Sequence, residues 1–256
     1  MADWNSELYM KFERERTRAA RDLLAQVSHL YPRSVFDLGC GPGNSTQLLL
    51  SAFPSAKIVG VDLSPNMLKV ARERAPGALF VEEDVEDWRP EETVDLIFAN
   101  ATLHFAEDHY ALIERLASFL SPGGALAVQM PNNMREASHA AMRMLSADEP
   151  WADRLLPIAK TRAIVGPPEE YYRLLGSRCS KLDLWQTIYI HPLDSVDRIV
   201  DWFEGSELRP FLKPLSAPER EVFLARYRAE LALAYAPLPN GKVLLRYPRL
   251  FFVAQK

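Results

Sequence analysis

The sequence of 256 residues has little cysteine, no excess of basic residues and no long apolar run. Two cysteines, Cys40 and Cys179, cannot build a disulfide framework or a metal site of recognisable spacing, so no metal is expected. The net charge of −4 argues against a general nucleic-acid binder, because phosphate binding needs a basic surface. No apolar run approaches the roughly 18 residues of a membrane span, and the charged start lacks a signal-peptide core. We therefore expect a soluble cytoplasmic protein that binds neither nucleic acid nor membrane.

The sequence does contain short apolar runs that alternate with helical patterns, which predicts an α/β fold with a doubly wound, mostly parallel sheet. Strands are expected at 34–38, 57–62, 78–81, 94–99, 124–130 and 182–190, and a last strand closes the chain. We expect a single domain over 1–256. Its parts are an N-terminal helical lid (1–30), a core (31–130), helical covers (131–180 and 194–240) and the final strand (241–256).

Three glycines at alternate positions follow the first strand in SVFDLGCGPGNST: Gly39, Gly41 and Gly43. Ligands of open α/β sheets bind at the carboxyl ends of the strands, so this backbone should come close to a ligand. No lysine follows, which argues against a triphosphate loop. Asn44 opens the next helix, whose free N–H groups favour an anion such as a carboxylate.

Polar residues end the next three strands. Asp62 ends the second strand about twenty residues after the glycines, the usual place for an acid that binds ribose hydroxyls. Asp84 follows the third strand, where it could accept a hydrogen bond from an exocyclic amine, and Asn100 ends the fourth. The ordered set predicts an adenosine pocket. The alternative is a set of turn glycines and solvated acids.

The stretches VFDLGCGPGNST, VGVDLSPNML, EEDVEDW and DLIFANATLHF resemble the successive motifs of the class I S-adenosylmethionine-dependent methyltransferases. The resemblance covers about the first 130 residues of the chain. It implies a Rossmann-like fold with a seven-stranded, mostly parallel sheet whose last strand is antiparallel, with helical cap insertions. It also implies S-adenosyl-L-methionine as cofactor and S-adenosyl-L-homocysteine as product.

The same resemblance implies roles for single residues. The glycine loop would pack on the methionine part of the cofactor, and Asp37 would help to hold its ammonium through water or backbone. Asp62 would hold both ribose hydroxyls. The adenine would be bound by Asp84 with the Val85 backbone and by Leu63 and Met67 on its faces.

Methyl transfer from a sulfonium is an in-line displacement, so catalysis is mainly alignment of the nucleophile with the methyl carbon. An acceptor that is already an anion needs no general base, and no catalytic residue is then required. The chain lacks the Asn/Asp-Pro-Pro-aromatic box of amide and adenine N-methylation after the fourth strand, and it lacks a Pro-Cys nucleophile. His104, just past Asn100, is expected to line the acceptor side.

An N-terminal helix over 6–26 would place Tyr9, Phe12 and Arg16 on one face with Ala20 and Leu23. Arg16 is the single charge on this apolar face. A guanidinium turned into a pocket suits bidentate capture of a carboxylate, and the alternative is that it reaches out to solvent.

Trp202 and Arg209 are the candidate substrate-binding residues of a second cover. For Trp202 the alternative is ordinary core packing. Arg209 precedes Pro210, which disfavours helix at that point. An aromatic ring beside an arginine would suit a planar anionic molecule. If these arginines do not hold the acceptor, Arg18 and Arg249 are next.

Seven stretches from nearly the whole chain resemble a narrower family of this superfamily, whose members esterify one carboxylate of a small tricarboxylate. They are DWNSELYMKFERERTRAARDLL, FDLGCGPGNST, LIFANATLHF, LAVQMPNN, ELRPFL, FLARYRAEL and YPRLFFVA. This resemblance implies a small anionic substrate. Two alternatives stay open: a methyltransferase for another small acid or a phenol, and a cofactor-binding protein without catalysis.

Overall fold

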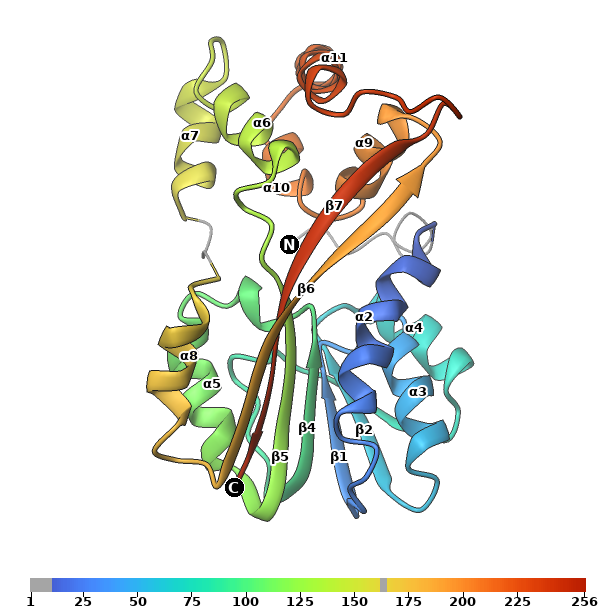
Figure 1. Ribbon diagram of the computed structural model, residues 1–256, viewed down its shortest axis with the longest axis vertical. Helices are drawn as coiled ribbons and strands as arrows, with labels where there is room; N and C mark the ends of the chain where they lie inside the picture. The colour runs from blue at the N-terminus through green and yellow to red at the C-terminus, as the bar shows by residue number, and fades with distance from the viewer. Residues whose placement is uncertain (1–10, 162–164) are drawn as a thin grey trace.

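A seven-stranded sheet forms the centre of the protein in a computed structural model, which describes residues 11–161 and 165–256 (Figure 1). The strand order is β3-β2-β1-β4-β5-β7-β6. The strands are β1 (Ser34–Leu38), β2 (Lys57–Asp62), β3 (Leu79–Glu82), β4 (Val94–Asn100), β5 (Leu120–Pro131), β6 (Lys181–Leu193) and β7 (Val243–Gln255).

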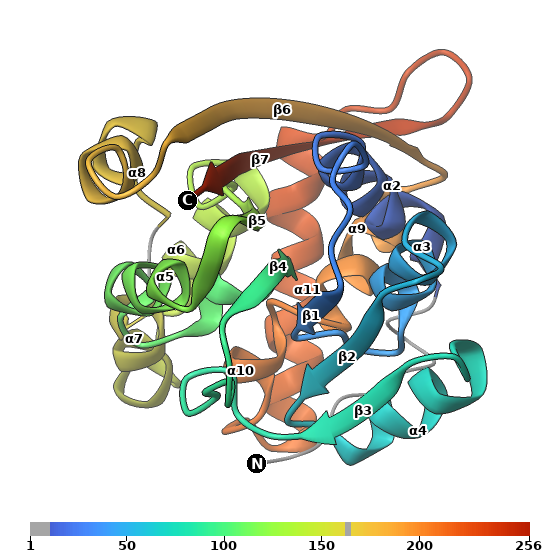
Figure 2. The ribbon, with the colours of Figure 1, turned by 90° about the horizontal axis from the view of Figure 1, so that it is seen from below.

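Helices cover both faces of this sheet (Figures 1 and 2). On one side lie α2 (Glu13–Ala25), α3 (Asn44–Ala52) and α4 (Pro65–Arg74), and on the other lie α5 (His109–Ser118) and α8 (Pro168–Leu175). The remaining helical segments are η1 (Leu103–Phe105), α6 (Ala137–Leu145), α7 (Ala152–Thr161), α9 (Val196–Glu204), α10 (Arg209–Leu212) and α11 (Ala217–Ala234).

The central strand β4 shows why the sheet is covered twice. Leu96 and Phe98 belong to the apolar core on one face, and Ile97 and Ala99 belong to the core on the other. Successive side chains of a strand point to opposite faces, so a continuous apolar run buries both. The apolar run ends at Asn100, whose polar side chain lies at the carboxyl edge of the sheet.

The sheet confirms the predicted architecture. Strand β1 pairs in parallel with β2 and with β4, and β7 pairs antiparallel with both β5 and β6. The antiparallel β6–β7 pair is longer than the rest of the sheet: its pairing runs from Lys181↔Gln255 to Leu193↔Val243, whereas β5 meets β7 only between Ala125↔Gln255 and Pro131↔Arg249. Half of the β6–β7 pair, towards Leu193 and Val243, therefore extends beyond β5.

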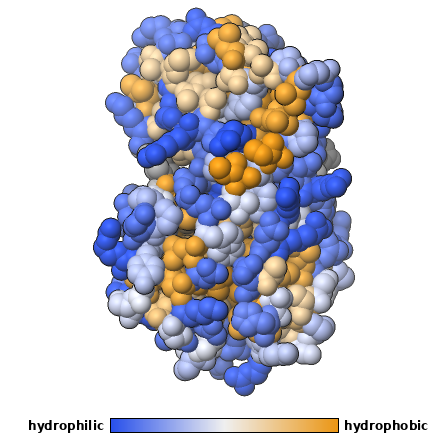
Figure 3. Space-filling model, in the orientation of Figure 1, coloured by the Kyte–Doolittle hydropathy of each residue, from blue (hydrophilic) through white to orange (hydrophobic). Residues whose placement is uncertain are grey.

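A helical cap, formed by α6, α7, α9, α10 and α11, lies above the carboxyl ends of the central strands (Figure 1). Several large side chains of the cap and of the residue before α7 are fully buried: Trp151, Trp202, Phe203, Phe211 and Phe223. The outer face of the β6–β7 pair is not covered by the cap, since Ile188, Ile190 and Leu244 are exposed there (Figure 3).

Element bounds differ from the sequence-based expectations in a few places. Strand β3 is shifted by one residue, and β5 begins at Leu120 because Leu120 already pairs with Val94. Helix α2 begins at Glu13, so Phe12 occupies its N-cap position, and Tyr9 lies outside the described residues. The expectation that Arg209 is not helical was wrong: Arg209 begins α10, because a proline in the first turn needs no backbone hydrogen bond.

Candidate active site

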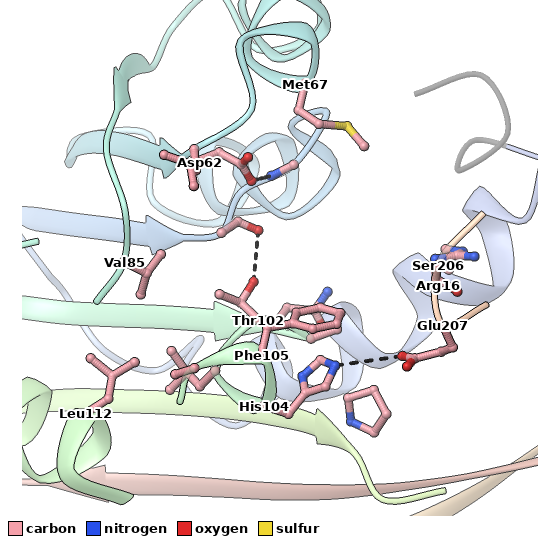
Figure 4. A pocket seen from close by; sticks show the side chains of 18 of the residues that line it. Arg16, Asp62, Met67, Val85, Thr102, His104, Phe105, Leu112, Ser206 and Glu207 are labelled. Carbon is pink, nitrogen blue, oxygen red and sulfur yellow. Dashed lines mark hydrogen bonds and ion pairs between the residues drawn. The ribbon is translucent and has the colours of Figure 1, made fainter. Parts of the chain in front are cut away.

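A cavity of about 310 Å³ lies between the sheet and the cap, at the carboxyl ends of β1, β2 and β4 (Figure 4). It is lined by residues of 16–131 and 202–249, with none of the described residues between Pro131 and Trp202. They are Arg16, Gly39, Gly41, Asp62, Leu63, Met67, Asp84, Val85, Glu86, Asn100, Ala101, Thr102, Leu103, His104, Phe105, Ala106, Leu112, Pro131, Trp202, Ser206, Glu207, Tyr247 and Arg249. Most of the residues that the sequence singled out therefore meet in one place.

Two glycines of the loop after β1 have different tasks. Gly39 has φ +65°, and a Cβ atom there would lie 1.9 Å from Oγ1 of Thr102. Gly41 has φ +54°, and a Cβ atom there would meet no protein atom within 4 Å. Both conformations are unfavourable for L side chains. Gly39 thus allows close packing on Thr102, and Gly41 leaves open space at the wall of the cavity.

Asp62 connects the glycine loop to the second strand. Its Oδ2 accepts a hydrogen bond from Gly41 N at 2.8 Å, and its Oδ1 accepts one from Ser64 N at 2.9 Å. Leu63 and Met67 follow on the same side of the cavity, the first half exposed and the second buried. This is the side on which Figure 4 places Asp62 and Met67.

Asp84 and Val85 line the cavity from the segment after β3, as does Glu86, which the sequence reading did not single out. Oδ1 of Asp84 accepts a hydrogen bond from the backbone of Glu86, and its carbonyl accepts from Asp87 and Trp88. The segment is a compact turn, so these side chains have a defined direction.

Asn100 ends β4 at the cavity, and its Oδ1 is a buried acceptor that receives no hydrogen bond from the described residues. Ala101, next to it, has φ +58°, an uncommon conformation for a residue with a side chain. Thr102 then donates from Oγ1 to the carbonyl of Gly39 at 3.2 Å. This contact holds the turn that carries His104 against the glycine loop.

Three residues of the expected cofactor set do not line the cavity. Gly43 and Asn44 begin α3, and Nδ2 of Asn44 donates to Oγ1 of Thr17. Asp37 is fully buried and accepts hydrogen bonds from Ser45 and Thr46. Burial raises its pKa to about 7, although both hydroxyl groups oppose the shift. Direct contact between Asp37 and a ligand is therefore not seen, and its indirect role stays a prediction.

Arg16 and Trp202 line the cavity together, Arg16 from α2 and Trp202 from α9 of the cap. Arg16 reaches in from α2, its Nη2 donates to the carbonyl of Trp202 at 3.1 Å, and its Cζ lies 5.3 Å from the Trp202 ring centroid. Phe12 packs on the same ring at 4.8 Å but does not line the cavity. Arg209 does not line it either.

Arg249 lines the cavity in addition to Arg16, although the sequence reading ranked it behind Arg209. It is only 4% exposed, its Nη1 donates to Oε1 of Gln129 at 2.8 Å, and its guanidinium lies over the Tyr247 ring at 4.6 Å. A period-two signal was present in the first half of β7, where Val243, Leu245, Tyr247 and Arg249 are buried and the residues between them are not. An arginine at a buried position of a strand needs a polar environment, which the cavity supplies.

The sequence alone did not predict the other lining residues, because one serine, glutamate or proline does not indicate that its side chain faces a cavity. Ser206 and Glu207 lie in the turn after α9, and Pro131 ends β5. Nε2 of His104 lies 4.0 Å from Oε1 of Glu207 (Figure 4). Among the residues described, no cluster of histidine, cysteine and acidic side chains suits a metal ion, and no helix is long and apolar enough to cross a membrane.

The comparisons with known proteins agree with this geometry. A family model described as a methyltransferase domain matches residues 35–124. The whole fold resembles the crystal structure of the YcgJ protein of Bacillus subtilis, with a TM-score of 0.60, 13% identity, and coverage of 93% of this chain and 98% of that one. It also resembles a phosphoethanolamine N-methyltransferase of Haemonchus contortus, with a TM-score of 0.55, 16% identity, and coverage of 93% and 52%.

The fold and the cavity at its strand ends define a class I methyltransferase. Two sequence relatives are trans-aconitate 2-methyltransferases of Rhodopseudomonas palustris, 51% and 50% identical over 100% of this chain and of their own length. A third, from Afipia carboxidovorans, is 50% identical over 99% of both chains. The chain belongs to the trans-aconitate 2-methyltransferase family, which confirms the narrower resemblance found in the sequence.

Proposed function

We propose that this protein uses S-adenosyl-L-methionine to esterify one carboxylate of trans-aconitate, with the monomethyl ester and S-adenosyl-L-homocysteine as products. One observation carries the proposal beyond the relatives' names: Arg16 and Arg249, from opposite ends of the chain, line the same cavity as the glycine loop and Asp62. Guanidinium groups bind carboxylates in a bidentate geometry, and a tricarboxylate offers several.

The residues at the strand ends fit the cofactor. Asp62 would accept the ribose hydroxyls, since its carboxylate lines the cavity at the end of β2, beside the glycine loop. Asp84 and the Val85 backbone would bind the adenine edge, with Leu63 and Met67 against the ring. The open space beside Gly41 would admit the methionine part.

Asn100 adds an independent reason for this fit. Its buried Oδ1 receives no hydrogen bond from the described residues and lies at the cavity, where an ammonium group would satisfy it. When bound, the cofactor supplies an electrophilic methyl group on a sulfonium. The chain itself orients the acceptor with Arg16, Arg249 and His104 and excludes water with the cap.

No general base is needed for this reaction, because the acceptor carboxylate is already ionised at neutral pH. Catalysis then rests on holding the nucleophilic oxygen in line, which can contribute several kcal/mol, on the order of 7 or more. Trp202 would support this orientation because Arg16 lies over its ring, and Phe12 packs on that ring. The acceptor is a small molecule, and the net charge of −4 gives no reason to expect nucleic acid.

The parts of the chain would divide the work as the sequence suggested. Residues 1–30 would act as a lid, 31–130 would hold the cofactor, and 131–180 with 194–240 would form the substrate cap before the final strand at 241–256. The exception within the cap segments is α8, which packs on the sheet beside α5. Both Cys40 and Cys179 are free thiols, which accords with action in the reducing cytoplasm.

The proposal is tested with purified protein and labelled S-adenosyl-L-methionine on trans-aconitate, cis-aconitate, citrate and isocitrate. Trans-aconitate should be methylated much faster than the other acids. Absence of turnover with every tricarboxylate would refute the proposed reaction.

A second candidate, methylation of another small acid or a phenol, is supported by His104, because a phenol needs a base and His104 lines the cavity. A panel of acids and phenols in the same assay separates the two. Cofactor binding without turnover on any member of the panel would instead indicate a protein that binds the cofactor without catalysis.

A further inference from the structure

Glu207 is a buried acid at the cavity. It lies between α9 and α10, is 4% exposed, and lines the same space as Arg16 and Arg249. A carboxylate here repels an anionic substrate, and a buried carboxylate is costly unless a cation lies close to it. Its position therefore calls for a function that outweighs the repulsion.

The turn that carries Glu207 is held by several hydrogen bonds. Leu208 N donates to the carbonyl of Phe203 at 2.8 Å, and Ser206 Oγ donates to the carbonyl of Trp202 at 3.2 Å. Both Phe203 and Leu208 are fully buried. The backbone on either side of Glu207 is thus fixed, and its side chain has a defined direction into the cavity (Figure 4).

His104 faces Glu207 across the cavity. Its Nε2 lies 4.0 Å from Oε1 of Glu207, and the two side chains are 8% and 4% exposed. The imidazole packs on Phe105 with 4.0 Å between ring centroids, and the preceding Thr102 is bonded to Gly39. The ring is consequently held in place from the side of the cofactor loop.

We propose that Glu207 is a positioning residue that acts through His104, an inference that rests on the proposed function. At an ion-pair distance of 4.0 Å the carboxylate favours the doubly protonated imidazole, so that the charged ring would attract a carboxylate of the acceptor. The pair adds no net charge to the cavity. It places a third cationic group beside the two guanidinium groups.

The other charged groups around the cavity explain why His104 needs this partner. Arg16 of α2 and Arg249 of β7 both disfavour a further positive charge near them. The acids Asp62, Asp84 and Glu86 line the cavity as well, from the strand ends that hold the cofactor in the proposed function. Glu207 is the acid that forms an ion pair with His104.

The main test is the pH dependence of acceptor binding in Glu207→Gln, an isosteric change that removes only the charge. At pH 7.5 the KM for trans-aconitate should rise about tenfold with kcat changed less than about twofold, as expected for loss of one charge-assisted contact. The pH at which KM begins to rise should also move to lower values. A fall in kcat with unchanged KM, or a profile equal to that of the wild type, would overturn the inference.

A double-mutant cycle tests whether Glu207 acts through His104. In a His104→Asn background, Glu207→Gln should have no further effect on KM, and the KM should no longer change with pH across the imidazole range. An equal additional rise in KM would show that Glu207 acts by another route. If Glu207→Gln does not fold, the pH dependence of KM in His104→Asn is the test. A pH dependence equal to that of the wild type would also overturn the inference.

Glu204→Gln is the matched control, since Glu204 ends α9 three residues earlier and does not line the cavity. The KM of Glu204→Gln for trans-aconitate should depend on pH as that of the wild type does. Melting temperature and affinity for S-adenosyl-L-homocysteine should match among the variants. Lack of turnover by the wild-type protein would defeat the proposed function and this inference together, whereas normal wild-type turnover with an unaffected Glu207→Gln defeats only the inference.

Discussion

The carboxylate of Asp62 accepts a hydrogen bond from the backbone N–H of Gly41, with 2.8 Å between Oδ2 and the nitrogen. This bond joins the ends of two adjacent parallel strands, β1 and β2, at the wall of the cavity. The same side chain therefore shapes the glycine loop and faces the space assigned to the cofactor.

Replacement of Asp62 by alanine should weaken cofactor binding strongly. Two ribose hydroxyls would lose a charged acceptor, and two bonds of about 1.5 kcal/mol each correspond to an increase in Kd of about a hundredfold. Calorimetric titration with S-adenosyl-L-homocysteine measures this change. Glu91→Ala, at an exposed position away from the cavity, should bind as the wild type does. An unchanged Kd for Asp62→Ala would refute the assigned role.

Gly41→Ala should separate backbone strain from ligand contact. Gly41 and Gly241 both have positive φ and would meet no protein atom with an added Cβ, but only Gly41 lines the cavity. Each substitution should lower the free energy of unfolding by about 1–2 kcal/mol. Gly41→Ala should in addition raise the Kd for S-adenosyl-L-homocysteine, as measured by calorimetry. Equal affinity in the two variants would mean that the cofactor does not approach this loop.

That the strand-end residues meet at one cavity could be predicted because each of them follows a strand. In a parallel sheet the carboxyl ends meet at one edge, so Gly41, Asp62, Asp84 and Asn100 come together whatever the details of the loops. The mostly parallel sheet was predicted from the apolar runs, and the antiparallel β7 was predicted from the family resemblance.

The remaining lining residues could be predicted only in part, because they come from elements that meet through the cap. Arg16 was found from the helical period of α2, but Glu207 lies in a turn, where no period identifies the inward side. Arg209 was ranked above Arg249 because of its neighbours in sequence. The pairing of β5 with β7, which brings Arg249 opposite Pro131, is a long-range contact that local sequence does not reveal.

The buried Asp37 should give the protein a pH-dependent stability. Burial raises its pKa from 3.8 to about 7, so folding takes up a proton between these values. The free energy of unfolding then falls as pH rises through this window, by up to about 1.4 kcal/mol per pH unit. Asp37→Asn keeps an acceptor for Ser45 and Thr46 and has no proton to lose. The difference in Tm, Asp37→Asn minus wild type, should therefore increase from pH 5 to pH 7 and stay constant above pH 7. A difference in Tm that is constant over the whole pH range would contradict this pKa.

Replacement of Arg249 should impair the acceptor more than the cofactor. The Arg249 guanidinium is aligned by Gln129 and Tyr247. Arg249→Ala should lose one charge-assisted contact of about 1.5–3 kcal/mol, which raises the KM for trans-aconitate about tenfold or more. Arg16→Ala should have a similar effect. Arg249→Lys keeps the charge but lacks the planar guanidinium group, so its KM should lie between the values of the wild type and of Arg249→Ala. Steady-state kinetics measure these values, with Arg228→Ala, an exposed ion pair on α11, as the control. A wild-type KM in both alanine variants, with an unchanged Kd for S-adenosyl-L-homocysteine, would place the acceptor carboxylates on other groups.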